Sequence, residues 1–168
     1  MNTNLMKNSH VSSICEKLKQ DGFKFKDEKF DYLDVIVATG TQFNMSWFKS
    51  TQINIFVIMG VVEKVSMEFA EAYSRMTLSY TMKNYKNIPK HMNNITASFP
   101  LLISPCIDDD AKQCIQQKPK SQLGFLEMPV ILDTNNNTLL FCSESTRRSG
   151  KKKFLASLIH KYFSTTNI

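Results

Sequence analysis

"WFKSTQINIFVIMGVV", residues 47–62, is the stretch that constrains the fold most strongly. From Ile55 onward its residues are apolar at almost every position and rich in β-branched and aromatic types, which is typical of a strand covered on both faces. The earlier stretch "FDYLDVIVATG", residues 30–40, alternates between apolar and more mixed positions. The two stretches therefore predict two strands, with the second one central in its sheet.

The other elements follow from helical spacing and from the distribution of turn residues. We expect helices at 11–19, from 66 to about 82, at 105–117 and from 150, and further strands at 97–104, 124–132 and 138–142. The resulting order, α-β-β-α-β-α-β-β-α, does not alternate strand and helix strictly. It therefore predicts an α+β domain, with helices packed against a mixed or antiparallel sheet of about five strands.

Cap and turn residues support several of these boundaries. Gly22 follows the first helix, where glycine readily adopts the left-handed conformation, and Ser66 is a good N-cap for the second. The carboxylates at 108–110 suit the positive end of the third helix. The asparagine-rich "DTNNN" at 133–137 predicts the turn of a hairpin, and Pro129 predicts that the longer hairpin arm is an edge strand or carries a bulge.

The second helix carries an aromatic and methionine stripe, formed by Phe69, Tyr73, Met76 and Tyr80. Such a stripe can line a ligand pocket, but at helical spacing it more often forms ordinary core. We interpret it as core. We do not assign it to a cofactor.

Length and composition indicate one globular domain. The chain has 168 residues, of which 42% are hydrophobic and 21% charged, far from the composition of disordered chains. Residues 1–9 are expected to form a flexible tail. The apolar runs are too short to cross a bilayer and the first residues lack the features of a secretory signal. We therefore expect no membrane span and a cytoplasmic location.

Cysteines and histidines give no clear site. The four cysteines are Cys15, Cys106, Cys114 and Cys142. They are too few for a disulfide scaffold, and none forms the close pair typical of structural zinc sites, so reduced thiols are favoured over a zinc site. His10, His91 and His160 are scattered and are interpreted as structural or exposed. No cofactor and no metal are expected.

Three possible catalytic sites can be considered, and each has a feature that argues against it. Asp34, Glu63 and Lys64 could supply a nuclease-type metal site, but the Glu-x-Lys spacing is absent, and we interpret the latter two as the solvated end of a strand. Cys106 lies near a helix start that could activate a thiol, but the neighbouring carboxylates oppose this. The stretch from Ser145 to Lys152 imitates a phosphate-binding loop, although it lacks the first glycine and the magnesium-binding hydroxyl.

Positive charge is concentrated near the C-terminus. The formal net charge is +6; six of the 21 basic residues, but only one of the 15 acidic residues, follow residue 133. Five cations fall within seven positions, directly before an apolar helix. The candidate anion site consists of Arg147, Arg148, Ser149, Gly150, Lys151, Lys152 and Lys153. We refer to it as the basic cluster.

Cations at a helix start oppose the helix dipole, so the basic cluster is not explained by helix stability. Together with free backbone amides, it would form a compact site for phosphate, sulfate or a nucleic-acid backbone. The alternative is a solvated basic loop that salt screens.

A resemblance concerns roughly the last 70 residues. The run "FPLLIS", the segment "KPK" and then "EMPVILD", followed by a turn, a short strand and an amphipathic helix, resemble a family of uncharacterised prokaryotic proteins of comparable size. Those proteins have an aromatic-glycine pair where this chain has Arg147 to Gly150. The resemblance implies a cytosolic prokaryotic domain and no catalytic residue.

Three functions are compatible with the sequence. The first is a binding module in which the basic cluster contacts a phosphorylated ligand or nucleic acid. The second is an interaction protein that forms a homo-oligomer through an edge strand of the late hairpin. The third is an enzyme whose site is assembled from loops, for which the sequence identifies no catalytic residue.

Overall fold

The structure is a computed structural model that describes residues 3–46, 49–85, 95–116, 121–122, 125–142 and 150–164. Its helices are α1 (Thr3–Met6), α2 (Ser9–Gln20), α3 (Met67–Asn84), α4 (Asp109–Gln116) and α5 (Gly150–Phe163). Its strands are β1 (Lys24–Phe30), β2 (Leu33–Ser46), β3 (Lys49–Val61), β4 (Lys64–Val65), β5 (Ile95–Ser104), β6 (Cys106–Ile107), β7 (Ser121–Gln122), β8 (Phe125–Glu127), β9 (Val130–Asp133) and β10 (Thr138–Phe141).

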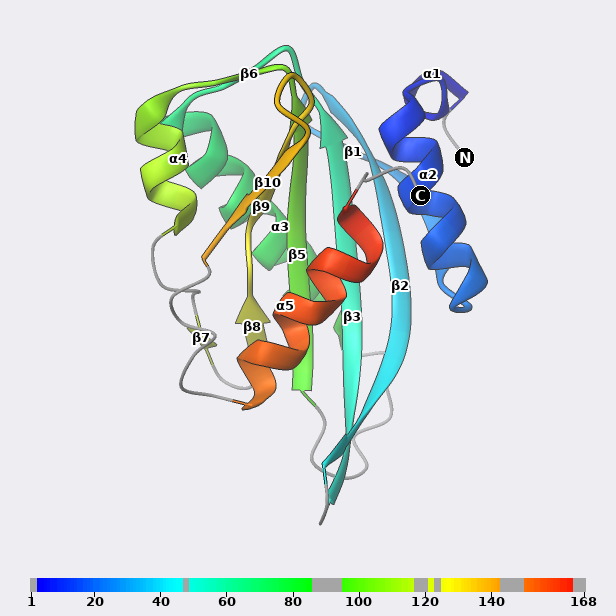
Figure 1. The fold of residues 1–168 in the computed structure, drawn as a ribbon. Helices are drawn as coiled ribbons and strands as arrows, with labels where there is room; N and C mark the ends of the chain where they lie inside the picture. The colour runs from blue at the N-terminus through cyan, green and yellow to red at the C-terminus, as the bar shows by residue number, and fades with distance from the viewer. Residues whose placement is uncertain are drawn as a thin grey trace.

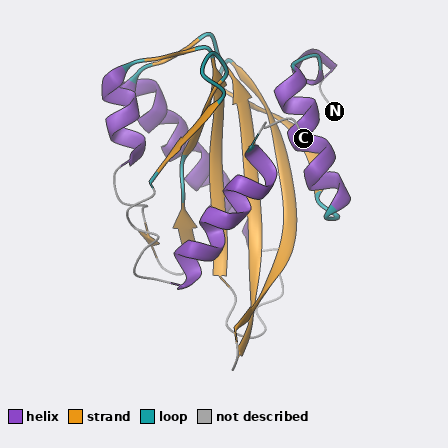
Figure 2. Cartoon of the chain, in the orientation of Figure 1, coloured by secondary structure: helices purple, strands orange, loops and turns teal. Residues whose placement is uncertain are grey.

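One mixed sheet organises the molecule (Figures 1 and 2). Strands β1, β2 and β3 form an antiparallel meander, and β5 lies parallel to β3 on its other side. Strands β8 and β9 both run parallel to β5, one after the other along its length. Antiparallel β7 and β10 complete this side. The predicted α+β class and mixed sheet are confirmed, although the sheet has more strands than expected.

Helices cover both faces of the sheet, which produces two cores. Residues of α2 and α5 pack with Ile55 and Val57 of β3 on one face. Residues of α3 and α4 pack with Phe56 and Ile58 on the other. Because successive strand residues point to opposite faces, a strand buried on both sides needs an unbroken apolar run. This explains the sequence of β3 and confirms its central position.

Strand β1 was not predicted. Five of its seven residues are charged, which hides the strand pattern. Only Phe25 and Phe30 contribute side chains to the margins of the two cores. The charges suit an edge strand, because they discourage pairing with another chain.

The N-terminal stretch differs from the expected flexible tail. It contains α1, and Leu5 and Met6 are partly buried against the core. Asn8 then caps α2 by accepting hydrogen bonds from the amides of His10 and Val11 at 3.0 and 3.3 Å. This cap explains why α2 begins before the predicted start at residue 11.

Helix α2 ends as predicted, with Gly22 in the left-handed region at φ 78°. The Gly22 amide donates to the Lys19 carbonyl at 3.0 Å, and the Phe23 amide donates to the Leu18 carbonyl at 3.1 Å. These two bonds are those of a Schellman motif, and buried Phe23 and Leu18 belong to the same core cluster.

Helix α3 begins as predicted, because the Ser66 side chain accepts from the Phe69 amide at 3.2 Å. Its buried face, however, is rotated relative to the predicted stripe. Tyr73 is buried, whereas Phe69, Met76 and Tyr80 are partly buried at the edge of the α3 core. The rest of the buried face consists of smaller residues: Ala70, Ser74, Thr77 and Thr81.

The late hairpin differs from its prediction in one respect. Pro129 interrupts the longer arm, dividing it into β8 and β9. Both pieces lie inside the sheet, since β5 pairs with them on one side and β7 and β10 on the other. The arm is therefore interrupted but is not an edge strand. The predicted turn is present, with Asp133 Oδ1 accepting from the amides of Asn135 and Asn136.

Candidate functional site

The basic cluster lies at the start of α5, whose later turns are firmly packed. Leu155, Leu158, Ile159, Tyr162 and Phe163 are buried on one side of the helix, as their spacing predicts. The rings of Phe163 and Phe99 meet edge to face, with centroids 5.9 Å apart. The helix is therefore anchored to the sheet independently of its first turn.

The first turn of α5 carries part of the basic cluster. Gly150 begins the helix and is exposed, and Lys153 is also exposed. Lys151 and Lys152 belong to the same turn by their backbone. Arg147, Arg148 and Ser149 lie outside the described residues. The structure thus places Gly150 and three lysines on one helical turn, at the end of α5 that lies away from Tyr162 and Asp21.

Charge is distributed unusually along α5. Its first turn contains no acidic residue, and the sequence contains none after Glu144. The backbone amides of a first turn carry partial positive charge, which adds to the field of the lysines. Both contributions favour an anion at this end of the helix.

The opposite end of α5 is fixed to α2. Asp21 accepts hydrogen bonds from Lys161, from the Tyr162 hydroxyl at 2.5 Å and from the Gln42 side chain at 3.4 Å. The Lys161 bond, together with the bond from Tyr162, lowers the pKa of the Asp21 carboxyl. Lys161 is thus engaged within the fold, unlike exposed Lys153. It is not available as an extension of the basic cluster.

The other predicted candidates do not form a site. Lys64 pairs with Asp108 at 3.0 Å, so it is engaged outside any cluster with Asp34 and Glu63. Cys106 is exposed in β6. Among the described residues, no group of three or more histidine, cysteine, aspartate or glutamate side chains could hold a metal ion.

The histidines of the described ranges occupy structural or surface positions. His10 belongs to α2, and His160 is exposed with its ring edge-on to that of Phe141, with centroids 5.3 Å apart. His91 lies outside the described residues. Cys15 is buried, as its helix face predicts, and burial raises the pKa of its thiol to about 11.

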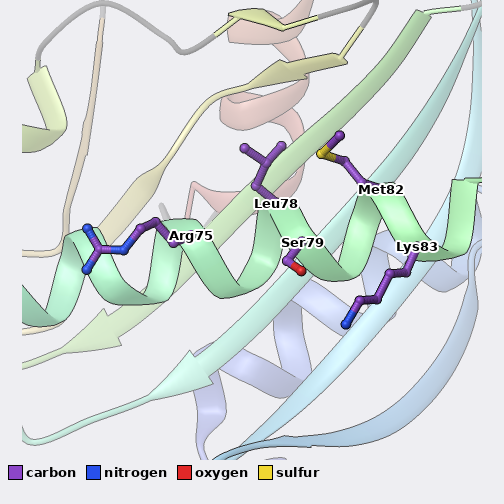
Figure 3. A pocket seen from close by; sticks show the side chains of 5 residues that line it. All are labelled: Arg75, Leu78, Ser79, Met82 and Lys83. Carbon is purple, nitrogen blue, oxygen red and sulfur yellow. The ribbon is translucent and has the colours of Figure 1, made fainter.

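A hollow of about 440 Å³ lies on α3, lined by Arg75, Leu78, Ser79, Met82 and Lys83 (Figure 3). All five residues come from this one helix, and in Figure 3 their side chains point in different directions. Arg75 also pairs with Glu71 at 3.7 Å. A binding pocket typically brings together groups that converge on one ligand. The residues that line this hollow do not converge, so we do not interpret it as a binding site.

A buried polar layer under α3 was missed by sequence reasoning. It consists of Asn54, Ser74, Thr77, Thr81, Thr96, Ser98 and Glu127. The Ser74 hydroxyl donates to the Glu127 carboxyl, and Thr81 donates to Ser98 at 3.2 Å. Glu127 is only 1% exposed, so solvent and substrates do not reach it. The layer joins α3 to the sheet rather than forming an open active site.

One signal for this layer was present in the sequence. Ser74, Thr77 and Thr81 recur at helical spacing, but hydroxyl residues at that spacing do not by themselves indicate burial. The partner carboxylate lies 53 positions further along the chain from Ser74. A contact over that distance has no local pattern.

Comparison with protein-family models, curated proteins and solved structures gives no match to this chain. The resemblance to uncharacterised prokaryotic proteins therefore stays a prediction. Within the described ranges, every helix is too short or too polar to serve as a transmembrane span.

Proposed function

We propose that the protein is a cytoplasmic binding module that holds polyanions, such as a nucleic-acid backbone or a phosphorylated ligand, through the basic cluster. The observation that carries this proposal is the first turn of α5. It combines three consecutive lysines with the positive end of the helix dipole and has no acidic residue.

The anchoring of α5 supports the same proposal. Its packing residues begin at Phe154 and its last turn is tied to Asp21, so the first turn contributes little apolar burial. Lys153 is exposed, and cations at this end of a helix oppose its dipole, so helix stability does not account for them. A binding role accounts for their position.

The test replaces all five cations, Arg147, Arg148, Lys151, Lys152 and Lys153, with glutamine. Binding to a labelled single-stranded oligonucleotide is measured by fluorescence anisotropy at two salt concentrations. For wild type we expect an affinity that falls as salt rises, because each neutralised phosphate releases a condensed cation. The variant should lose this binding and retain the wild-type circular dichroism spectrum.

The matched control removes five positive charges from exposed lysines elsewhere: Lys7, Lys19, Lys24, Lys29 and Lys83. Both variants have the same net charge, so a difference between them reports the position of the charge. We expect the control to bind within a few-fold of wild type. Equal loss in both variants would contradict a local site, as would the absence of wild-type binding at low salt.

A further inference from the structure

A polar hollow of about 440 Å³ lies on the sheet where β1 begins. Its lining includes Lys24 of β1, Thr39 and Thr41 of β2, and Gln52, Asn54 and Phe56 of β3. Thr39 pairs in register with Lys24 on one side and with Phe56 on the other, and Thr41 pairs with Asn54. Residues paired in this way point to the same side of a sheet, which here is the side that α3 covers. Side chains from three strands therefore converge on this hollow, unlike those of the hollow on α3.

Asn54 is the buried polar residue of this site. It is 1% exposed, and its β3 neighbours at 53 and 55–59 are all buried and apolar. Its Oδ1 accepts hydrogen bonds from the Thr41 hydroxyl at 3.4 Å and from the Gln52 amide at 3.3 Å. Its Nδ2 donates to no acceptor within the described part of the chain. Because a buried donor without a partner destabilises a fold, folding alone does not explain an asparagine at this position.

The two side chains that bond to Asn54 separate it from the hollow only weakly. Thr41 is exposed, Gln52 is partly exposed, and both line the hollow. Their bonds to Asn54, at 3.4 and 3.3 Å, are longer than the roughly 3.2 Å at which typical protein hydrogen bonds end. A ligand in the hollow that replaces these two long bonds therefore reaches the Asn54 amide.

Lys24 gives the hollow a positive charge. Its side chain is exposed and forms no ion pair within the described ranges. Asp21 also lines the hollow, but its carboxylate already accepts hydrogen bonds from three side chains of the fold. The Lys24 ammonium and the Asn54 Nδ2 are thus two donors without acceptors, on the two outer strands of the site.

We propose that this hollow binds a small molecule through an oxyanion group, a phosphate ester or a carboxylate, held between the Lys24 ammonium and the Asn54 amide. Two strand spacings, roughly 10 Å, separate the backbones of these residues, and an oxyanion supplies acceptors to both. The volume of the hollow lies within the roughly 300–1,000 Å³ of small-molecule sites, so the rest of the ligand rests on Thr39, Thr41 and Gln52. The site lies on the face of α3, whereas α5 and its basic cluster cover the other face. It therefore holds or fails independently of polyanion binding.

Titration of the ¹⁵N-labelled chain with inorganic phosphate and with sodium acetate, followed by NMR at constant pH and ionic strength, tests the site directly. We expect the side-chain amide signals of Asn54 and Gln52 to shift and saturate. The control is the Asn84 side-chain amide, which donates to the Tyr80 carbonyl at 2.9 Å and should not shift. A shift with phosphate alone identifies a phosphate ester as the ligand, and a shift with acetate alone identifies a carboxylate. No shift with either anion at about 50 mM, well above a millimolar Kd, would overturn the proposal, since a buried water molecule would then satisfy the amide.

Two variants assign the binding to the proposed groups, with the backbone amide of Thr41 as the reporter. Lys24→Gln should raise the anion concentration at half-saturation by about tenfold, as expected for the loss of a charge-assisted bond. Lys29→Gln removes the same charge from an exposed position of β1 and should change it by less than about twofold. Asn54→Leu should abolish the shift and unfold at no lower urea concentration than wild type, because it removes an unpartnered buried donor. Equal effects of the two lysine substitutions would overturn the proposal, as would undiminished binding by a folded Asn54→Leu variant.

Discussion

The Tyr162 hydroxyl donates a hydrogen bond of 2.5 Å to Asp21, 141 positions earlier in the chain. Lys161 donates to the same carboxylate oxygen. This carboxylate joins the last turn of α5 to the loop after α2. The two helices that cover one face of the sheet are thus tied to each other as well as to the sheet.

Tyr162→Phe removes the hydroxyl and keeps the buried ring. We expect the free energy of unfolding to fall by about 1.5–3 kcal/mol, the typical contribution of a hydrogen bond to a charged group. Urea denaturation measures the change. Tyr32→Phe is the control, because that side chain is 79% exposed, and it should change the stability by less than about 0.5 kcal/mol. An equal effect of the two substitutions would contradict a stabilising contact at Asp21.

The same carboxylate predicts a pH dependence. Its pKa is lowered in the folded state, chiefly by Lys161 and also by Tyr162. The stabilisation is therefore complete above the unfolded pKa of about 4 and disappears as pH falls through the folded value. Asp21→Asn should be less stable than wild type between pH 5 and 7, and the difference should shrink below pH 4. A difference that stays constant down to pH 2 would exclude this linkage.

The buried polar layer predicts a large effect from a small change. Ser74→Ala removes the hydroxyl that donates to the Glu127 carboxyl, which is buried. Loss of a hydrogen bond to a buried polar group costs about 1–3 kcal/mol. Ser79→Ala, an exposed position on the same helix, should be neutral or slightly stabilising because alanine favours helices. Similar values for the two variants in urea denaturation would show that the layer contributes nothing.

Local signals account for the parts of the fold that were predicted. The apolar run of β3, the Ser66 cap, the turn after Asp133 and the face of α5 each depend on residues close in sequence. The missed parts depend on distant partners. The charged residues of β1 are compatible with a strand only because Phe25 and Phe30 meet the cores, and α3 buries hydroxyls only because Ser98 and Glu127 receive them.

The same contrast between local signals and distant partners applies to the candidate site. The basic cluster was visible in the sequence because its five cations are consecutive or nearly so. The point at which β1 stops pairing with β2, at Thr39, was not visible in it. The length of one strand relative to its neighbour is set by the whole sheet, and no local pattern reports it.

Replacing Gly22 and replacing Gly150 with alanine should have opposite effects on the stability of the fold. Gly22 has φ 78° in the Schellman motif, where a Cβ is strained, so Gly22→Ala should cost about 1 kcal/mol. Gly150 begins α5, and a Cβ added there would meet no atom within 4 Å. Gly150→Ala should be neutral or stabilise by up to about 1 kcal/mol. Thermal unfolding of both variants decides the matter, and destabilisation of Gly150→Ala would contradict the open geometry at the helix start.

Gly40 packs beneath the ring of Phe23. A Cβ at this position would lie 2.7 Å from two ring atoms. Phe23 is 5% exposed and its ring meets that of Tyr162 edge-on, with centroids 5.5 Å apart. The ring therefore cannot move without disturbing Tyr162 and its bond to Asp21. Gly40→Ala should cost about 1–3 kcal/mol through overpacking.

Gly60 supplies the comparison for this prediction. Its added Cβ would lie 2.9 Å from the end of the partly buried, flexible Leu33 side chain, which can rotate away, so Gly60→Ala should cost less. A double-mutant cycle tests the assigned contact: in a Phe23→Leu background the cost of Gly40→Ala should fall by about 1 kcal/mol or more, since the two positions touch. Additive effects of the two substitutions in urea denaturation would mean that the ring is not the obstacle at Gly40.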